Sequence, residues 1–231
     1  MELRDYIPPE MLRTRLEELC LQIKLLKLGR IEPFVTKAME KPSLEAVHKS
    51  IIMLQNLQAL DKDENLLPLG YHLARMPVDP QSGKMIILGA IFGCLDPVCI
   101  IAASLSFKDA FIIPLGKERE ADEARRRLAE GSQSDHIMLI NAFQGWERAK
   151  ASGRQRQYCF DNFLSDNTLK LLGDMKGQFA DLLNDLGFVS SRNPKDPKVN
   201  INSGKSLCVT DASSKFISNI GKRQEVISNI G

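Results

Sequence analysis

Residues 59–80 read ALDKDENLLPLGYHLARMPVDP, and this stretch decides how the first third of the chain is interpreted. A charged turn, Asp61 to Asn65, lies between two short apolar segments, a pattern that predicts a small β-hairpin. A short helix is expected from Leu69 to Met76, because Pro77 follows it. Helices followed by a hairpin with a charged tip are typical of a winged helix, although the pattern alone does not establish one.

Upstream of this stretch, apolar residues recur at helical spacing. They occupy every third or fourth position from Leu12 to Leu26, which predicts an amphipathic helix that Gly29 ends. A short helix is expected over residues 32–39. Ser43 is a favourable N-cap for a third helix, whose buried stripe would comprise Val47, Ile51, Leu54 and Leu57.

Downstream of Pro80 the pattern is helical. Residues 83–95 are apolar on nearly all sides and predict a buried central helix. Asp96 and Pro97 begin a second apolar helix that runs to Leu105. Further helices are expected over residues 117–130, 134–151 and 167–186, the last one closed by Gly187. Helices joined by short links predict an antiparallel bundle, so the fold class is mainly α.

Composition excludes several classes of protein. Apolar residues make up 43% and charged residues 26% of the 231, which is ordinary for a globular protein. The net charge of +2 gives no general attraction to polyanions, so any nucleic-acid contact would depend on local clusters. The five cysteines form no C-x-x-C pair, which argues against a zinc site or a disulfide framework. The apolar run of residues 85–95 is too short to span a bilayer, so we expect no membrane partner.

Two short motifs resemble nucleotide-binding elements but lack their context. Gly204-Lys205-Ser206 ends like a phosphate-binding loop, but Val199 stands where that loop needs its first glycine. Asp122 to Arg125 resembles an acidic metal-binding box, yet charged residues flank it where a buried strand would be required. The interpretation as a solvated helix face with charge pairs at helical spacing is therefore favoured.

Clusters of basic residues are the remaining signal for a binding function. They comprise Arg125 to Arg127, then Arg148, Lys150, Arg154 and Arg156, and finally Arg192, Lys195 and Lys198. Each could contact phosphates, but alone each is more typical of a solvated face. Tyr158 and Phe160 lie near the second cluster, and two aromatic residues do not establish a base-stacking platform.

Several longer segments resemble one known family. They are PEMLRT at 9–14, LEELCLQIK at 16–24, LPLGYHLARMPVDP at 67–80, GKM at 83–85, CLDP at 94–97, AASLS at 102–106, SDH at 134–136 and NAFQGW at 141–146. Together they resemble the accessory region that follows the second RecA-like domain of DEAH-box RNA helicases, collinearly from Pro9 to Asn202. Residues 104–118 and 188–197 are most similar to the subgroup that unwinds RNA and G-quadruplexes.

The resemblance implies a division of the chain. Residues 1–9 would be a lead-in from the second RecA-like domain, 10–80 a winged helix with a small β-hairpin, and 81–202 a ratchet bundle of antiparallel helices. Residues 203–231 are expected to be an atypical, disordered tail, in which the pentapeptide ISNIG occurs twice. In the family, ATP and magnesium bind between the RecA-like motor domains, which this chain lacks. We therefore expect no cofactor and no catalytic residue here, and a fragment inactive as an ATPase.

By the same resemblance, the chain is expected to guide an RNA strand while the motor moves it. The expected partners are single-stranded RNA or structured nucleic acid, and the RecA-like motor domains. Arg192 and Lys195 are the first candidates for strand contact, followed by His136 and Asn141 at the channel wall. The alternative is a protein-interaction module that docks onto a helicase motor or a regulator. An intracellular location, nuclear or cytoplasmic, is expected in either case.

Overall fold

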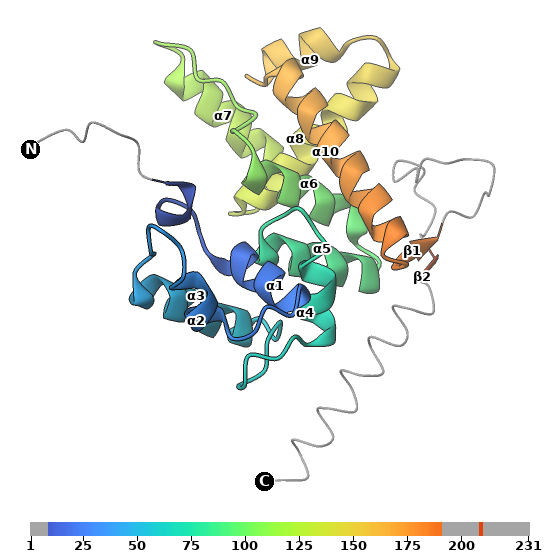
Figure 1. The fold of residues 1–231 in the computed structure, drawn as a ribbon. Coiled ribbons are helices and arrows are strands. Elements are labelled where there is room, and N and C mark those ends of the chain that lie inside the picture. The colour runs from blue at the N-terminus through green and yellow to red at the C-terminus, as the bar shows by residue number, and fades with distance from the viewer. Residues whose placement is uncertain (1–8, 191–207, 210–231) are drawn as a thin grey trace, which may run out of the picture. The chain divides into compact units, whose positions relative to one another are not determined.

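The computed structural model describes residues 9–190 and 208–209, and the fold is mainly helical (Figure 1). The chain divides into two compact units, one ending at Lys84 and the other beginning at Met85. No helix in the described residues has the length and apolarity needed to cross a membrane.

The helices of the first unit are α1 (Glu17–Leu25), α2 (Ile31–Val35), α3 (Leu44–Asn56) and α4 (Pro68–Leu73), preceded by a 3-10 turn at Glu10–Leu12. In this unit, α1 contacts the three other helices, α2, α3 and α4. Cys20, Ile31 and Leu54 are fully buried between them. The predicted N-cap is confirmed, because the hydroxyl of Ser43 accepts a hydrogen bond from the amide of Ala46. The helix predicted from Leu12 begins only at Glu17, since the exposed Leu12 lies outside the buried stripe.

The predicted β-hairpin is reduced to one antiparallel bridge between Leu60 and Leu66. Asp61 closes the turn, because its carboxylate accepts hydrogen bonds from the amides of Asp63 at 2.9 Å and Asn65 at 2.7 Å. Pro68 then begins α4 two residues after the bridge, which leaves no room for a longer strand. At Gly70 a Cβ atom would collide with the carbonyl of Ala59, so α4 packs closely on the residue before the bridge.

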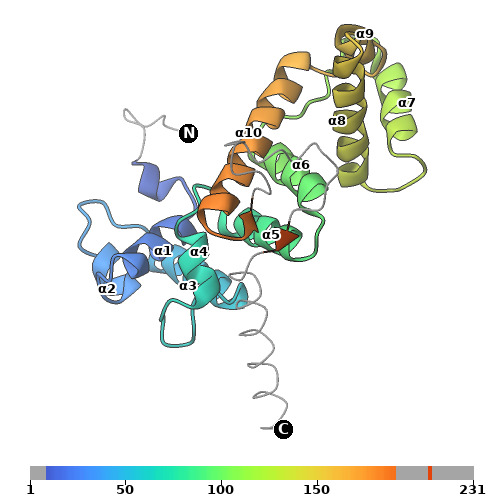
Figure 2. The ribbon, with the colours of Figure 1, turned by 90° about the vertical axis from the view of Figure 1, so that its right-hand side faces the viewer.

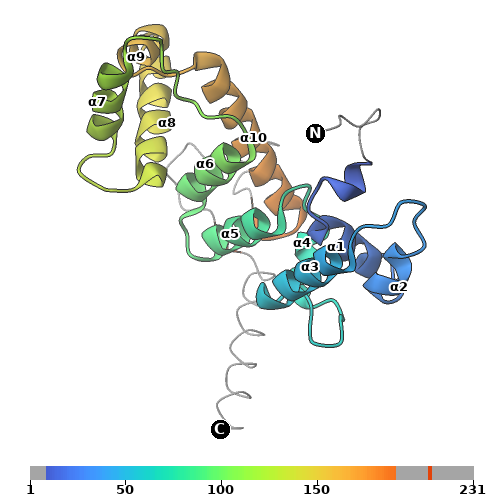
Figure 3. The same cartoon turned by 90° about the vertical axis from the view of Figure 1, so that its left-hand side faces the viewer.

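The second unit is a helical bundle closed by a short antiparallel strand pair. Its elements are α5 (Pro80–Ile91, which begins in the first unit), α6 (Leu95–Ser106), α7 (Glu118–Leu128), α8 (Asp135–Ala151), α9 (Gln155–Asp161), α10 (Asp166–Asp185), β1 (Val189–Ser190) and β2 (Cys208–Val209). Figures 2 and 3 show α6 between α8 and α10, and it contacts both. Phe143, Leu169 and Leu172 lie in this core.

Two of the bundle helices agree closely with their predicted limits. The hydroxyls of Ser134 and Ser165 cap α8 and α10 by accepting hydrogen bonds from the amides of Ile137 and Thr168. Gly187 follows α10 with a φ of 78°, as expected for a helix-ending glycine. Helix α9 was not predicted, and β2 lies in the segment expected to be a disordered tail. The rest of that segment lies outside the described residues.

A buried ion cluster joins three helices of the bundle. The ammonium of Lys176 on α10, whose side chain is 4% exposed, lies 2.6 Å from Oδ1 of Asp96 on α6. It also lies 3.6 Å from Oε1 of Glu147 on α8 and 5.1 Å from the centre of the Phe143 ring. Burial raises the pKa of Glu147, although the charge of Lys176 opposes that shift.

Candidate nucleic-acid interface

The corner between α8 and α9 carries an uninterrupted cationic segment. Residues 148–156 read RAKASGRQR, with four basic residues and no acidic one. Arg148 and Lys150 occupy the last turn of α8, where cations interact favourably with the helix dipole. Gly153 turns the chain in the left-handed region, with a φ of 70°, and the amide of Arg154 donates to the carbonyl of Ala149 at 2.8 Å. The turn therefore brings Arg154 back toward α8.

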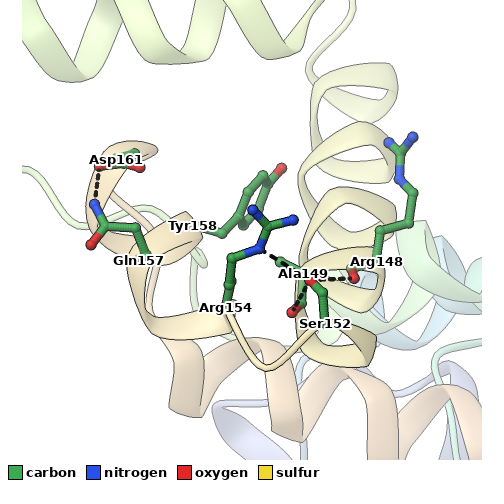
Figure 4. A pocket seen from close by; sticks show the side chains of 7 residues that line it. All are labelled: Arg148, Ala149, Ser152, Arg154, Gln157, Tyr158 and Asp161. Atoms are coloured by element: carbon green, nitrogen blue, oxygen red, sulfur yellow. Dashed lines mark hydrogen bonds between the residues drawn. The ribbon is translucent and has the colours of Figure 1, made fainter.

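This corner encloses an open hollow of about 330 Å³. Figure 4 shows its lining residues, which are Arg148, Ala149, Ser152, Arg154, Gln157, Tyr158 and Asp161. Nε of Arg148 donates to the carbonyl of Gln144 at 3.3 Å, and Nε of Arg154 donates to the Ser152 hydroxyl at 3.4 Å. Among the described residues, neither arginine has an acidic partner, so the ends of both guanidinium groups are available to an anion.

Nearby carboxylates offset only part of this positive charge, with Glu147 facing Lys150 and Asp166 facing Arg156. Asp161 is the one acidic residue that lines the hollow, and its Oδ1 accepts a hydrogen bond from Nε2 of Gln157 at 2.8 Å. Glu147, which directly precedes the segment, faces Lys176 at 3.6 Å. All four basic residues of the segment are exposed. The corner is therefore locally cationic on a chain whose net charge is only +2.

Tyr158 holds α9 against α8. Its hydroxyl donates to the carbonyl of Ala142 at 3.4 Å, and burial raises its pKa, so the hydroxyl stays protonated at neutral pH. The ring fits over Gly145, where a Cβ atom would collide with the Tyr158 hydroxyl. This packing gives a physical reason for glycine in the middle of α8. Tyr158 therefore has a structural role at the base of the hollow.

The predicted cluster at residues 125–127 separates into different roles. Arg125 pairs with the carboxylate of Asp109 at 3.0 Å and lies over the Phe111 ring at 4.7 Å. Arg127 donates to the side-chain oxygen of Asn162 at 3.0 Å and to the carbonyl of Asp161 at 3.4 Å. Two of the three arginines therefore stabilise the bundle, and Arg127 anchors the end of α9.

None of the four predicted contact residues is among those that line this hollow in the described part of the chain. Arg192 and Lys195 lie outside the described residues. His136 is exposed in the first turn of α8, and Nδ2 of Asn141 donates to the carbonyl of Leu128 at 2.8 Å, at the end of α7. Asn141 lies seven residues before Arg148, or about 10 Å along the helix. The sequence feature that could have indicated this site is the absence of acidic residues from 148 to 156.

Two family models match consecutive segments of the chain. Residues 50–78 match the helicase associated domain (HA2), winged-helix, and residues 79–139 match the helicase associated domain (HA2), ratchet-like. The boundary between the two matches lies immediately before α5.

Curated relatives match between 81% and 97% of the chain. The ATP-dependent DNA/RNA helicase DHX36 of Mus musculus is 54% identical over 235 residues, covering 97% of this chain and 24% of its own length. The DExH-box ATP-dependent RNA helicase DExH1 of Arabidopsis thaliana is 47% identical, covering 82% of this chain and 19% of its own length. The ATP-dependent RNA helicase DHX29 of Homo sapiens is 44% identical, with coverages of 81% and 14%. This chain thus spans a quarter or less of these relatives. With both helicase-associated domains matched in order and this identity along the chain, the sequence carries HA2 winged-helix and ratchet domains and is similar to the accessory region of DEAH-box helicases.

Proposed function

We propose that this chain is the strand-guiding accessory module of an ATP-dependent DEAH-box RNA helicase, and that the α8–α9 hollow contacts the sugar-phosphate backbone. The observation that carries the proposal is the pair of guanidinium groups of Arg148 and Arg154 at an open hollow. Arginine suits this role, because its planar fork binds phosphate oxygens in pairs. The neighbouring Lys150 and Arg156 extend the cationic surface.

The mechanism is positioning, and the chain supplies no chemical step. Contacts to phosphates hold a strand in register without reading its sequence, and they gain free energy from released counterions. ATP and magnesium would act in the RecA-like motor domains, and the strand would move relative to this module when those domains close. Within the proposal, the partners are single-stranded RNA or structured nucleic acid and the motor domains.

The test is a salt-dependent binding assay on the complete chain. Fluorescence anisotropy with a labelled single-stranded RNA would compare the wild type with the double variant Arg148→Glu/Arg154→Glu. Because each phosphate contact contributes about 0.7 to the slope of log K against log salt for single strands, we expect the slope to fall by about 1.4. Affinity should fall to a similar extent for RNAs of different sequence.

A matched control carries the same change of charge outside the hollow. Lys108→Glu/Arg126→Glu reverses two exposed cations, one between α6 and α7 and one on α7. This variant should bind more weakly only through the change in net charge. Equal loss of affinity in the two double variants would refute the hollow as the contact site. If the affinity of the wild type does not change with salt concentration, contact with the backbone is refuted altogether.

Arg192 and Lys195 remain part of the proposal as further strand contacts, with His136 and Asn141 as additional ones at the channel wall. Arg192→Glu/Lys195→Glu should weaken RNA binding about evenly across sequences, because phosphate contacts carry no sequence information. Unchanged affinity would remove these two residues from the interface. Asn141→Ala should also loosen the contact between α7 and α8, so its effect on binding has to be compared with its effect on stability.

An exposed apolar loop favours a second candidate function, docking onto the helicase motor. Between α6 and α7 the chain exposes Ile112 (51%), Ile113 (48%) and Leu115 (99%). Adjacent exposed apolar side chains are typical of surfaces that bind another protein. A pull-down with motor domains of a DEAH-box relative as bait, after nuclease treatment, should retain the wild type and lose Ile112→Ser/Leu115→Ser. Retention of both would refute docking through this loop.

A further inference from the structure

Phe160 is exposed on α9, the helix that contributes Gln157, Tyr158 and Asp161 to the hollow. Its side chain is 75% exposed, whereas Tyr158, two residues earlier, packs against Gly145. Burying a phenylalanine side chain contributes about 1.5–3 kcal/mol to the stability of the fold, and the exposed Phe160 contributes little of this. Arg156 precedes it by four residues, so the two exposed side chains share one face of α9.

The position of Phe160 relative to the hollow follows from helix geometry. Gln157 lines the hollow and lies three residues before Phe160, which places the two about 60° apart around the helix axis. Arg154, the N-cap of α9, lies six residues before Phe160, or about 9 Å along the axis and about 120° around it. A strand whose backbone contacts Arg154 would therefore have to cross Gln157 and bend around α9 to place a neighbouring base on Phe160.

We propose that the α8–α9 corner is a binding site selective for single-stranded nucleic acid, in which Phe160 stacks on a base while Arg148 and Arg154 hold the backbone. The inference rests on the proposed function and adds a reason why the site would bind single strands more tightly than duplexes. Every base has a flat π-face, so stacking on an aromatic side chain tolerates any sequence. In a duplex the bases are already stacked on one another, and Phe160 has no free base to contact. Duplexes would retain the phosphate contacts alone.

The alternative role for Phe160 is a contact with another protein. The surroundings favour nucleic acid, because Arg154 at the N-cap of α9 and Arg156 on the face of Phe160 are exposed and a strand is anionic. An apolar protein partner would have to leave those cations unpaired at the edge of the contact.

The experiment compares Phe160→Ala with the wild type for a single-stranded RNA and for a duplex of the same length. Single-strand affinity should fall about 5- to 150-fold, while duplex affinity and the salt slope should not change. Phe160→Trp should bind the single strand about as tightly as the wild type does, because tryptophan also stacks on bases. The matched control is Phe92→Ala, which truncates a phenylalanine that is 76% exposed in the link between α5 and α6. It should bind both RNAs as the wild type does.

The outcomes separate this inference from the proposed function. Unchanged single-strand affinity in Phe160→Ala, with weakened binding in Arg148→Glu/Arg154→Glu, would overturn the stacking role and leave the backbone contact in place. Equal losses for single strand and duplex would also overturn it, because stacking predicts a difference between them. If Phe160→Ala and the double charge reversal both leave binding unchanged, the corner is not an RNA site, and the proposed contact fails as well.

Discussion

Replacing Lys176 by methionine tests whether the buried ion cluster stabilises the bundle. The change keeps an apolar side chain of similar length but removes the ammonium, leaving Asp96 and Glu147 without their shared cation. Breaking a fully buried ion pair costs about 3–5 kcal/mol. Here the carboxylate side chains are 31% and 28% exposed, so water compensates part of the loss. We therefore expect the free energy of unfolding to fall by about 2–3 kcal/mol.

Trp146 provides the signal for this measurement. It is the single tryptophan of the chain and lies on α8 beside Glu147, so its fluorescence reports unfolding of the second unit. In urea, with a slope of about 1–3 kcal/mol per molar, the midpoint of the transition should move to lower urea by about 0.7–3 M. The triple variant Asp96→Asn/Glu147→Gln/Lys176→Met should recover most of the lost stability, because no buried charge is then left unpaired.

Two results would refute this reasoning. A loss below about 0.5 kcal/mol in Lys176→Met would show that solvent screens the cluster as it does a surface ion pair. A triple variant no more stable than Lys176→Met would show that the lost stability came from packing around the lysine stem, because the carboxylates would then not be responsible.

Three further changes follow from the structure. Burial raises the pKa of Glu147 above 4.5 in the folded state, so its contribution to stability is fully present below pH 4.5 and is lost as the pH rises through the raised value. The stability of the wild type relative to Glu147→Gln should therefore fall with rising pH in urea titrations, and a constant difference would contradict this. Gly145→Ala forces the Tyr158 ring away and should cost about 1–3 kcal/mol in thermal unfolding. Adding Tyr158→Ala should cost less than it does in the wild type, whereas simple additivity would count against the contact. Ser165→Ala removes the hydroxyl that caps α10 and should cost about 1 kcal/mol by the same measurement, and no loss would mean that water replaces the cap.

Long, capped helices were the part of the fold that the sequence predicted best. Ser134 precedes α8 and Ser165 precedes α10, and the apolar residues behind them keep helical spacing for four turns or more. Such signals are local, so they can be found without knowing the neighbours. Helix α9 was not predicted because its seven residues, Gln155–Asp161, are largely polar and too few to show a helical spacing of apolar residues.

Side-chain contacts between distant segments could not be predicted from the sequence. Arg125 and Asp109 are 16 residues apart, and Arg127 and Asn162 are 35 apart, so the cluster 125–127 looked like one solvated face. The hairpin was overestimated for a different reason. The pattern around residues 61–65 fits a hairpin, but α4 begins at Pro68, two residues after the bridge, so no longer strand can form.

The anchor between Arg127 and the end of α9 has a consequence for how binding strength can be adjusted. Arg127 belongs to α7 and grips α9 by the Asp161 carbonyl and the Asn162 side chain, yet it is not among the residues that line the hollow. A tilt of α7 would therefore be passed to the end of α9 that carries Phe160. Under the proposed function, affinity for a strand would then depend on a helix that contributes no residue to the hollow.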